Sequence, residues 1–184
     1  MKRKLLILSV LAICIATLTT GTLAFFTSEG RAHNVITTGG VKIAVQEWAD
    51  ESRQTPFRDL EGIMPSMSAT KIAEIKNTGA SAAWVRVKVE KNIQLQGDDT
   101  PDADLVKLDL NQTDWTLGQD GYYYYNQALQ PNAVTKPIFT AVTFDASMGN
   151  EYQHAKVSVD VSAQAVQTAN NGDAAMAAQG WPNS

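Results

Sequence analysis

The sequence contains very little cysteine and histidine. Its 184 residues include one cysteine, Cys14, and two histidines, His33 and His154. Because Cys14 lies in an apolar run near the N-terminus, the rest of the chain can form neither a disulfide nor a thiolate metal site. We therefore expect the folded domain to be stabilised by packing alone.

Motifs of catalytic sites are also missing. The sequence has no HExxH zinc motif, no Gly-x-Ser-x-Gly nucleophile elbow and no glycine-rich phosphate loop. His33 and His154 lie in different segments, without a further ligand at metal-binding spacing. The acidic stretch 98–104 does not have the spacing of an EF-hand, and we interpret it as a solvated loop. We therefore expect a protein that is not an enzyme and binds neither a cofactor nor a metal.

The N-terminus has the pattern of a secretory signal. Basic residues at 2–4 precede an apolar run, and Thr22 and Ala24 form a small-residue pair before a predicted cleavage site between Ala24 and Phe25. We expect residues 1–24 to be removed on export, with membrane contact only through the uncleaved signal. The alternative is an uncleaved anchor, because the apolar character continues to Phe26 and reaches the roughly 20 residues of a membrane helix.

Removal of this leader makes the chain more acidic. Residues 1–24 hold three basic residues and no acidic ones, so the net charge changes from −4 to −7. Such a charge disfavours nucleic acid as a partner. The remaining 160 residues are enough for one domain with a substantial core. We assign residues 25–40 to an N-terminal arm and residues 41–184 to that domain.

Apolar and polar residues alternate in several short segments, and this period predicts β-strands. Three valines alternate with larger polar residues in segment 84–90, and valines and alanines alternate with polar residues in segment 156–165. The same period recurs in segments 41–46, 71–76, 106–110 and 138–144. Because turn residues separate these segments, we predict an all-β fold, an antiparallel β-sandwich.

The C-terminal segment departs from the strand pattern. Asp173 is placed to cap a short helix over residues 174–179, and Gly180 is placed to end it. We expect Trp181 to pack back on the sandwich. The alternative is a frayed terminus, because an alanine-rich helix of this length is marginal in water.

Four consecutive tyrosines occupy positions 122–125. In a strand, alternation sends two of these rings to each face, so one pair could be exposed for stacking on sugar, with Tyr123 and Tyr124 as the candidate residues. This would suit a carbohydrate-binding module. The alternative is that one pair enters the core and the other lies at the rim between the sheets with its hydroxyls in water.

Several motifs, in this order, resemble those of one family of bacterial surface proteins. The stretches are GTLAFFT at 21–27, NVITTGGVKI at 34–43, KNTG at 76–79, AWVRV at 83–87, DGYYYY at 120–125, LQPN at 129–132 and AQAVQ at 163–167. Their order and combination resemble the TasA/camelysin family of Gram-positive surface and matrix proteins. Relatives usually carry Pro-Gly where this chain has Pro131 and Asn132.

The resemblance implies a secreted protein with a jelly-roll-like sandwich. Its leader would be handled by a SipW-type signal peptidase, and its place would be the cell surface or the extracellular matrix. For the best-known relatives it implies assembly into biofilm fibres through donated N-terminal strands, so the implied partners are copies of the chain itself or related matrix subunits. Camelysin-type relatives have also been classed as metallopeptidases, but no ligand motif here supports that activity.

These observations lead to a hypothesis for the N-terminal arm. Phe25 and Phe26, followed by Val35 and Ile36, would be apolar anchors on an extended segment that pairs with a sheet edge of the next subunit. Burial of each phenylalanine contributes on the order of 2 to 3 kcal/mol before the cost of ordering the arm. The alternative is that the arm docks on its own sandwich. The runner-up function is a surface carbohydrate-binding module, and a secreted metallopeptidase comes third.

Overall fold

The computed structural model describes residues 35–37, 40–58, 64–95, 100–152 and 154–182. The chain divides into two units, Met1–Ala32 and His33–Ser184, and all described residues belong to the second. These residues form two β-sheets and contain no α-helix, which confirms the predicted all-β sandwich. Among them, no helix is both long and apolar enough to span a membrane.

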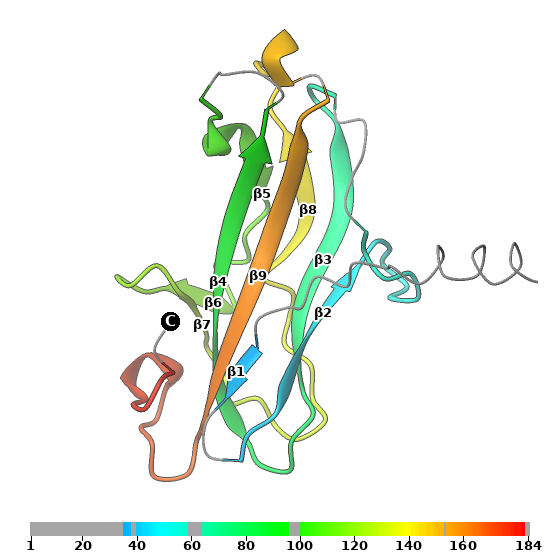
Figure 1. The fold of residues 1–184 in the computed structure, drawn as a ribbon. Helices are drawn as coiled ribbons and strands as arrows, with labels where there is room; N and C mark the ends of the chain where they lie inside the picture. The colour runs from blue at the N-terminus through cyan, green and yellow to red at the C-terminus, as the bar shows by residue number, and fades with distance from the viewer. Residues whose placement is uncertain (1–34, 38–39, 59–63, 96–99, 153, 183–184) are drawn as a thin grey trace, which may run out of the picture. The chain divides into compact units, whose positions relative to one another are not determined.

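In the described part of the chain, nine strands make up the two sheets (Figure 1). The larger sheet has the order β1-β9-β4-β7-β6, and the smaller has the order β2-β3-β8-β5. The strands of the larger sheet are β1 (Val35–Thr37), β9 (Lys156–Gln167), β4 (Ala83–Gln94), β7 (Tyr123–Tyr125) and β6 (Trp115–Leu117). Those of the smaller sheet are β2 (Ile43–Trp48), β3 (Ser68–Asn77), β8 (Phe139–Phe144) and β5 (Val106–Leu108).

Strands β4 and β9 form the long antiparallel pair at the centre of the larger sheet. Their register runs without interruption from Ala83 opposite Gln167 to Gln94 opposite Lys156. The alternation that predicted both strands explains this pairing, because one face of each strand enters the core. Val85 and Val87 are fully buried there. The predicted strands 84–90 and 156–165 are therefore confirmed, and both extend further than the sequence pattern indicates.

The core lies between the two sheets and is rich in aromatic side chains. Trp115 and Tyr125 contact each other with ring centroids 4.9 Å apart, and Phe139 and Phe144 come from the facing sheet. The Trp115 Nε1–H donates to the backbone carbonyl of Lys136 at 3.0 Å, so its one polar group is satisfied. This packing agrees with the expectation that the domain is stabilised without cross-links.

One pair of strands corrects the predicted antiparallel arrangement. Strand β1 pairs with β9 in parallel, whereas the other strand pairs are antiparallel. The chain turns at Gly40, whose φ of +74° suits glycine, and then enters β2 in the opposite sheet. Because β1 and β2 belong to different sheets, no hairpin fixes the direction of β1, and it runs parallel to β9.

The C-terminal segment is also different from the prediction. It contains a single 3₁₀ turn, η3 (Ala175–Ala177), in place of a helix over 174–179, and its first cap is Ala174, with no side-chain cap bond from Asp173. Asn171 fixes the segment instead, because its side chain bonds to both the backbone N–H and the carbonyl of Gln179. These bonds hold Gln179 beside Asn171, and the backbone is already extended at Ala178, directly after the 3₁₀ turn.

Candidate assembly site

Strand β1 lies at the edge of the larger sheet, beside β9 (Figure 1). Val35, Ile36 and Thr37 pair with 163–165 of the same chain. The backbone of two of the four predicted anchors, Val35 and Ile36, therefore pairs within the domain to which they belong, as in the alternative of intramolecular docking. The other two, Phe25 and Phe26, and the predicted cleavage site after Ala24 lie outside the described residues.

Strand β1 covers only part of the β9 edge. All twelve residues of β9 pair with β4 on one side, but on the other side β1 pairs with three of them. Among the described residues, no strand pairs with 156–162 on that second side. An uncovered strand edge presents backbone N–H and C=O groups that another strand can bind.

A buried lysine occupies the seam beside this uncovered edge. The Lys71 Nζ, on β3, donates to the backbone carbonyl of Val159 at 2.8 Å and lies 2.9 Å from Glu47 Oε1. The same Nζ lies 4.3 Å from the centre of the Phe57 ring. The side chains of Lys71 and Glu47 are 4% and 9% exposed. The lysine therefore connects the two sheets and binds one of the edge carbonyls that a new strand would need.

A second lysine bridges the opposite seam in a similar way. Strand β7 pairs with β4 at Arg86 and Val87, and an isolated bridge joins Ala83 to Leu129, so beyond Val87 this β4 edge has no neighbouring strand among the described residues. There the Lys91 Nζ donates to the backbone carbonyl of Val106 on β5 at 2.9 Å, and it lies 3.8 Å from Asp104 Oδ1. Each seam is thus bridged by an ammonium group that reaches the backbone of the facing sheet.

The sequence analysis missed both bridging lysines. In segment 71–76, Lys71 stands at the start of a weak alternation, and Lys91 follows the clear alternation of 84–90. A lysine beside a strand pattern normally lies in water. Neither side chain has a nearby partner in the sequence that would mark it as buried, so no local signal could have identified it.

The tyrosine run divides between the two faces of β7, as alternation requires. Tyr125 is buried in the main core and Tyr123 packs against it, while Tyr122 and Tyr124 face the outer side of the larger sheet. The outer pair does not lie in water, because the C-terminal segment covers it. Tyr124 is 7% exposed, and Trp181 meets its ring edge to face at 5.7 Å. The expected packing of Trp181 on the sandwich is confirmed.

Arg86 is the centre of the outer cluster, which also contains Asp120, Tyr122, Tyr124, Gln164 and Trp181. Its guanidinium donates to Gln164 Oε1 at 2.7 and 2.9 Å and to Asp120 Oδ2 at 2.9 Å. It also lies over the rings of Tyr122 and Trp181, with 4.0 and 4.7 Å to the ring centres. The side chain is 11% exposed, and its contacts with Trp181 hold the C-terminal segment on the sheet.

The titration of Asp120 reflects the same contacts. Burial alone would raise its pKa, but hydrogen bonds from the Tyr124 hydroxyl and the Tyr122 backbone N–H, together with the Arg86 charge, lower the pKa below its ordinary value. The pKa of Tyr124 is raised, first by burial and then by its hydrogen bond to Asp120. Both directions favour an ionised Asp120 that accepts from a neutral tyrosine.

The residues considered for metal binding do not come together in the described part of the chain. No group of three or more His, Cys, Asp or Glu side chains there could hold a metal ion. His154 is exposed, whereas His33 lies outside the described residues. In the acidic stretch, Asp102 caps the 3₁₀ turn η1 (Ala103–Leu105) by accepting from the Asp104 N–H at 2.9 Å.

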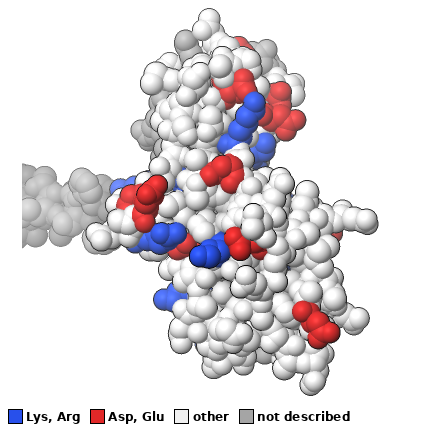
Figure 2. All heavy atoms as spheres, turned by 180° about the vertical axis from the view of Figure 1, so that it is seen from behind, with Lys and Arg blue, Asp and Glu red and all other residues white. Residues whose placement is uncertain are grey.

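Charges of both signs are mixed on the face opposite to the view of Figure 1. Figure 2 shows lysine and arginine side chains next to aspartate and glutamate, with large uncharged areas between them. This face therefore offers no extended basic surface of the kind that nucleic acid requires.

Comparisons with known proteins do not place the chain in a family. No family model matches it, and no curated protein or solved structure matches it either. Its function must therefore be inferred from the motifs in its sequence and from the geometry of its sheet edges and seams.

Proposed function

We propose that this chain is a secreted structural subunit of a biofilm matrix or cell-surface fibre of a Gram-positive bacterium. In this proposal a SipW-type signal peptidase frees the arm at Phe25, and the arm of one subunit then pairs with a jelly-roll-like sandwich of the next. The partners are copies of the chain or related matrix subunits. The observation that carries the proposal is the pairing of β1, a three-residue strand, with the edge of the twelve-residue β9.

A short edge strand can be exchanged between copies at little cost. The backbone bonds that β1 makes with 163–165 are the same whether β1 belongs to the same chain or to a neighbour. The difference in free energy between the monomer and the strand-exchanged assembly then comes from the arm before β1. Burial of Phe25 and Phe26 would supply on the order of 2 to 3 kcal/mol each in a neighbour's groove.

The direction of the contact explains growth in one dimension. The donor surface is the N-terminal arm and the acceptor surface is the β9 edge, so every subunit has one of each. Such a head-to-tail contact does not have to close on itself, and it can propagate as a filament. The carbohydrate-binding alternative is less well supported, because it needs the ring of Tyr124, which Trp181 covers.

The test compares three chains that differ only in their starting residue. A chain that begins at Phe25 should form oligomers in light scattering and filaments in electron microscopy, and one that begins at Gly39 should stay monomeric. A chain that begins at Thr27 keeps β1 but lacks both phenylalanines, so it separates their contribution from that of the strand. Because β1 pairs with β9, circular dichroism must first establish that the shortest chain is folded.

A matched substitution tests the two phenylalanines without shortening the chain. The double variant Phe25→Ser, Phe26→Ser keeps the full mature length and the whole of β1. We expect it to assemble at least about tenfold more weakly than the unchanged chain, since loss of 1.4 kcal/mol already changes a constant tenfold. Equal assembly of the unchanged chain, this variant and the chain from Gly39 would refute the proposal.

A further inference from the structure

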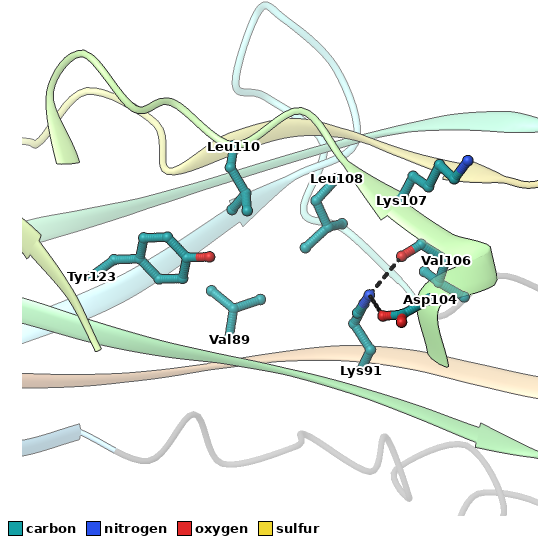
Figure 3. A pocket seen from close by; sticks show the side chains of 8 residues that line it. All are labelled: Val89, Lys91, Asp104, Val106, Lys107, Leu108, Leu110 and Tyr123. Carbon is teal, nitrogen blue, oxygen red and sulfur yellow. Dashed lines mark hydrogen bonds and ion pairs between the residues drawn. The ribbon is translucent and has the colours of Figure 1, made fainter. Parts of the chain in front are cut away.

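A cavity of about 380 Å³ lies in the seam between β4 and β5 (Figure 3). It is on the opposite side of β4 from β9, so it is separate from the β1 edge. Its lining residues are Val89, Lys91, Asp104, Val106, Lys107, Leu108, Leu110 and Tyr123. Its volume is near the lower end of the range of small-molecule sites, roughly 300 to 1,000 Å³.

The cavity exists because the strands that would fill the seam are short. Strand β7 leaves β4 after Val87, and β5 has only three residues. Beyond Val87, no strand among the described residues lies beside β4 at this edge of the larger sheet. The space is therefore a consequence of the topology of the sandwich and does not need a side chain to move.

Four of the eight lining residues are aliphatic and form one wall of the cavity, and the other four are charged or polar. Val89 projects from β4, and Leu108 and Leu110 face it from the β5 side (Figure 3). These branched side chains also pack against the main core, which fixes their positions. This aliphatic wall suits a hydrocarbon chain of medium length.

Two polar groups face this apolar space. The Tyr123 hydroxyl points into it from one side (Figure 3). The Lys91 ammonium lies at the other end, where it donates to the Val106 carbonyl. An ammonium has three donors, and a tyrosine hydroxyl can both donate and accept. The cavity thus combines one cationic donor and one neutral donor with an apolar middle.

The charge of Lys91 is only weakly compensated. Asp104 Oδ1 lies 3.8 Å away, and the Asp104 side chain is 97% exposed, so water screens it. Lys107, the other cation of the lining, points away from the cavity and pairs with Asp145 Oδ2 at 2.5 Å. A negatively charged ligand group would therefore meet Lys91 as its main partner.

We propose that this cavity binds a carboxylate that carries an aliphatic chain of medium length. The carboxylate takes a charge-assisted hydrogen bond from Lys91, the chain lies between Val89 and the two leucines, and the Tyr123 hydroxyl offers a second donor. A long fatty acid would exceed the volume. This inference does not depend on the proposed fibre function, because neither β1 nor the arm takes part.

Octanoate is the probe for the test, with octanol as its uncharged counterpart. Each is titrated at pH 7 and low salt into the mature chain while methyl resonances are followed by NMR. We expect saturable shifts at Val89, Leu108 and Leu110, and octanoate should bind at least about tenfold more tightly than octanol. Absence of saturable shifts at these residues, or equal affinity for the two probes, would overturn the proposal.

Variants identify the group that recognises the charge. Lys91→Met should abolish the preference for octanoate over octanol, and Lys91→Arg should keep it. The ratio of the two affinities is measured within each variant, so a loss of stability does not affect it. Lys88→Met is the matched control, because Lys88 lies on the same strand but pairs with Glu90 on the surface, and it should leave the ratio unchanged. A preference that survives Lys91→Met would contradict the assignment.

A strand from a second copy is the competing occupant of the seam. If it occupied the cavity, the same methyl resonances would shift with protein concentration in the absence of octanoate, and octanoate would not bind to the oligomer. That result would also overturn the proposal. Tyr123→Phe provides an independent check, because loss of one donor should weaken octanoate severalfold without changing the fold.

Discussion

Replacement of Lys71 by methionine tests the most buried charge in the described part of the chain. Methionine keeps most of the length of the side chain but removes the ammonium, which lies 2.9 Å from Glu47 Oε1 and 2.8 Å from the Val159 carbonyl. The Glu47 carboxylate, 9% exposed, would then lose the Lys71 ammonium. The Val159 carbonyl would lose its donor at the same time.

The expected loss of stability is large because the pair is buried. Removal of one partner of a buried ion pair costs about 3 to 5 kcal/mol. We include the cost of the unsatisfied Val159 carbonyl in this range, because the same ammonium serves both groups. For a domain with a free energy of unfolding of about 5 to 15 kcal/mol, this is a considerable fraction. The double variant Lys71→Met, Glu47→Leu should recover most of the loss, since neither charge of this pair remains.

Urea unfolding followed by tryptophan fluorescence measures these differences. The slope of free energy against urea should be the same for all variants, so that the midpoint reports stability alone. Lys88→Met is the control, because the Lys88 ammonium pairs with Glu90 at 2.8 Å on the surface, where the side chains are 44% and 51% exposed. Its midpoint should not change. A loss below about 1 kcal/mol for Lys71→Met, or a double variant no more stable than the single one, would refute the reasoning.

Two further predictions concern the outer cluster and a turn. Because the pKa of Asp120 is lowered in the folded state, its contribution is complete above the ordinary pKa and is lost as pH falls through the folded value. The NMR signals of Trp181 should therefore shift below about pH 4, and Asp120→Asn should remove this shift. In the turn, a Cβ on residue 79 would lie 2.8 Å from the Lys42 backbone nitrogen, so Gly79→Ala should cost about 1 to 3 kcal/mol in urea unfolding; an unchanged midpoint would contradict this.

The two longest strands could be predicted because their side chains alternate strictly. In β4 and β9 every second residue is valine or alanine over much of the length, and these residues enter the core. The division of the tyrosines between the faces of β7 follows from the same period. In these strands the two-residue repeat determines both the alternation in the sequence and which side chains are buried.

Shorter elements could not be predicted, because three residues carry no usable period. Strand β6 was missed, although its Trp115 is one of the most buried side chains. The parallel direction of β1 depends on a change of sheet at Gly40, and the sequence does not indicate to which sheet a strand belongs. The prediction of a C-terminal helix was wrong because contacts with distant residues set the path of that segment. These contacts come from Asn171 and from the outer cluster.

The bridging lysine also limits where a donated strand could enter in the proposed fibre. Along 156–162 a new strand would compete with Lys71 for the Val159 carbonyl, and displacement of the ammonium would separate it from Glu47 in a buried place. At 163–165 the acceptor groups are occupied only by β1, whose departure exposes no buried charge described here. Because β9 remains paired with β4 along all twelve residues, the acceptor edge keeps its shape when β1 leaves. In the proposed fibre, the neighbour's arm therefore takes the position of β1, and Lys71 keeps the rest of the edge closed.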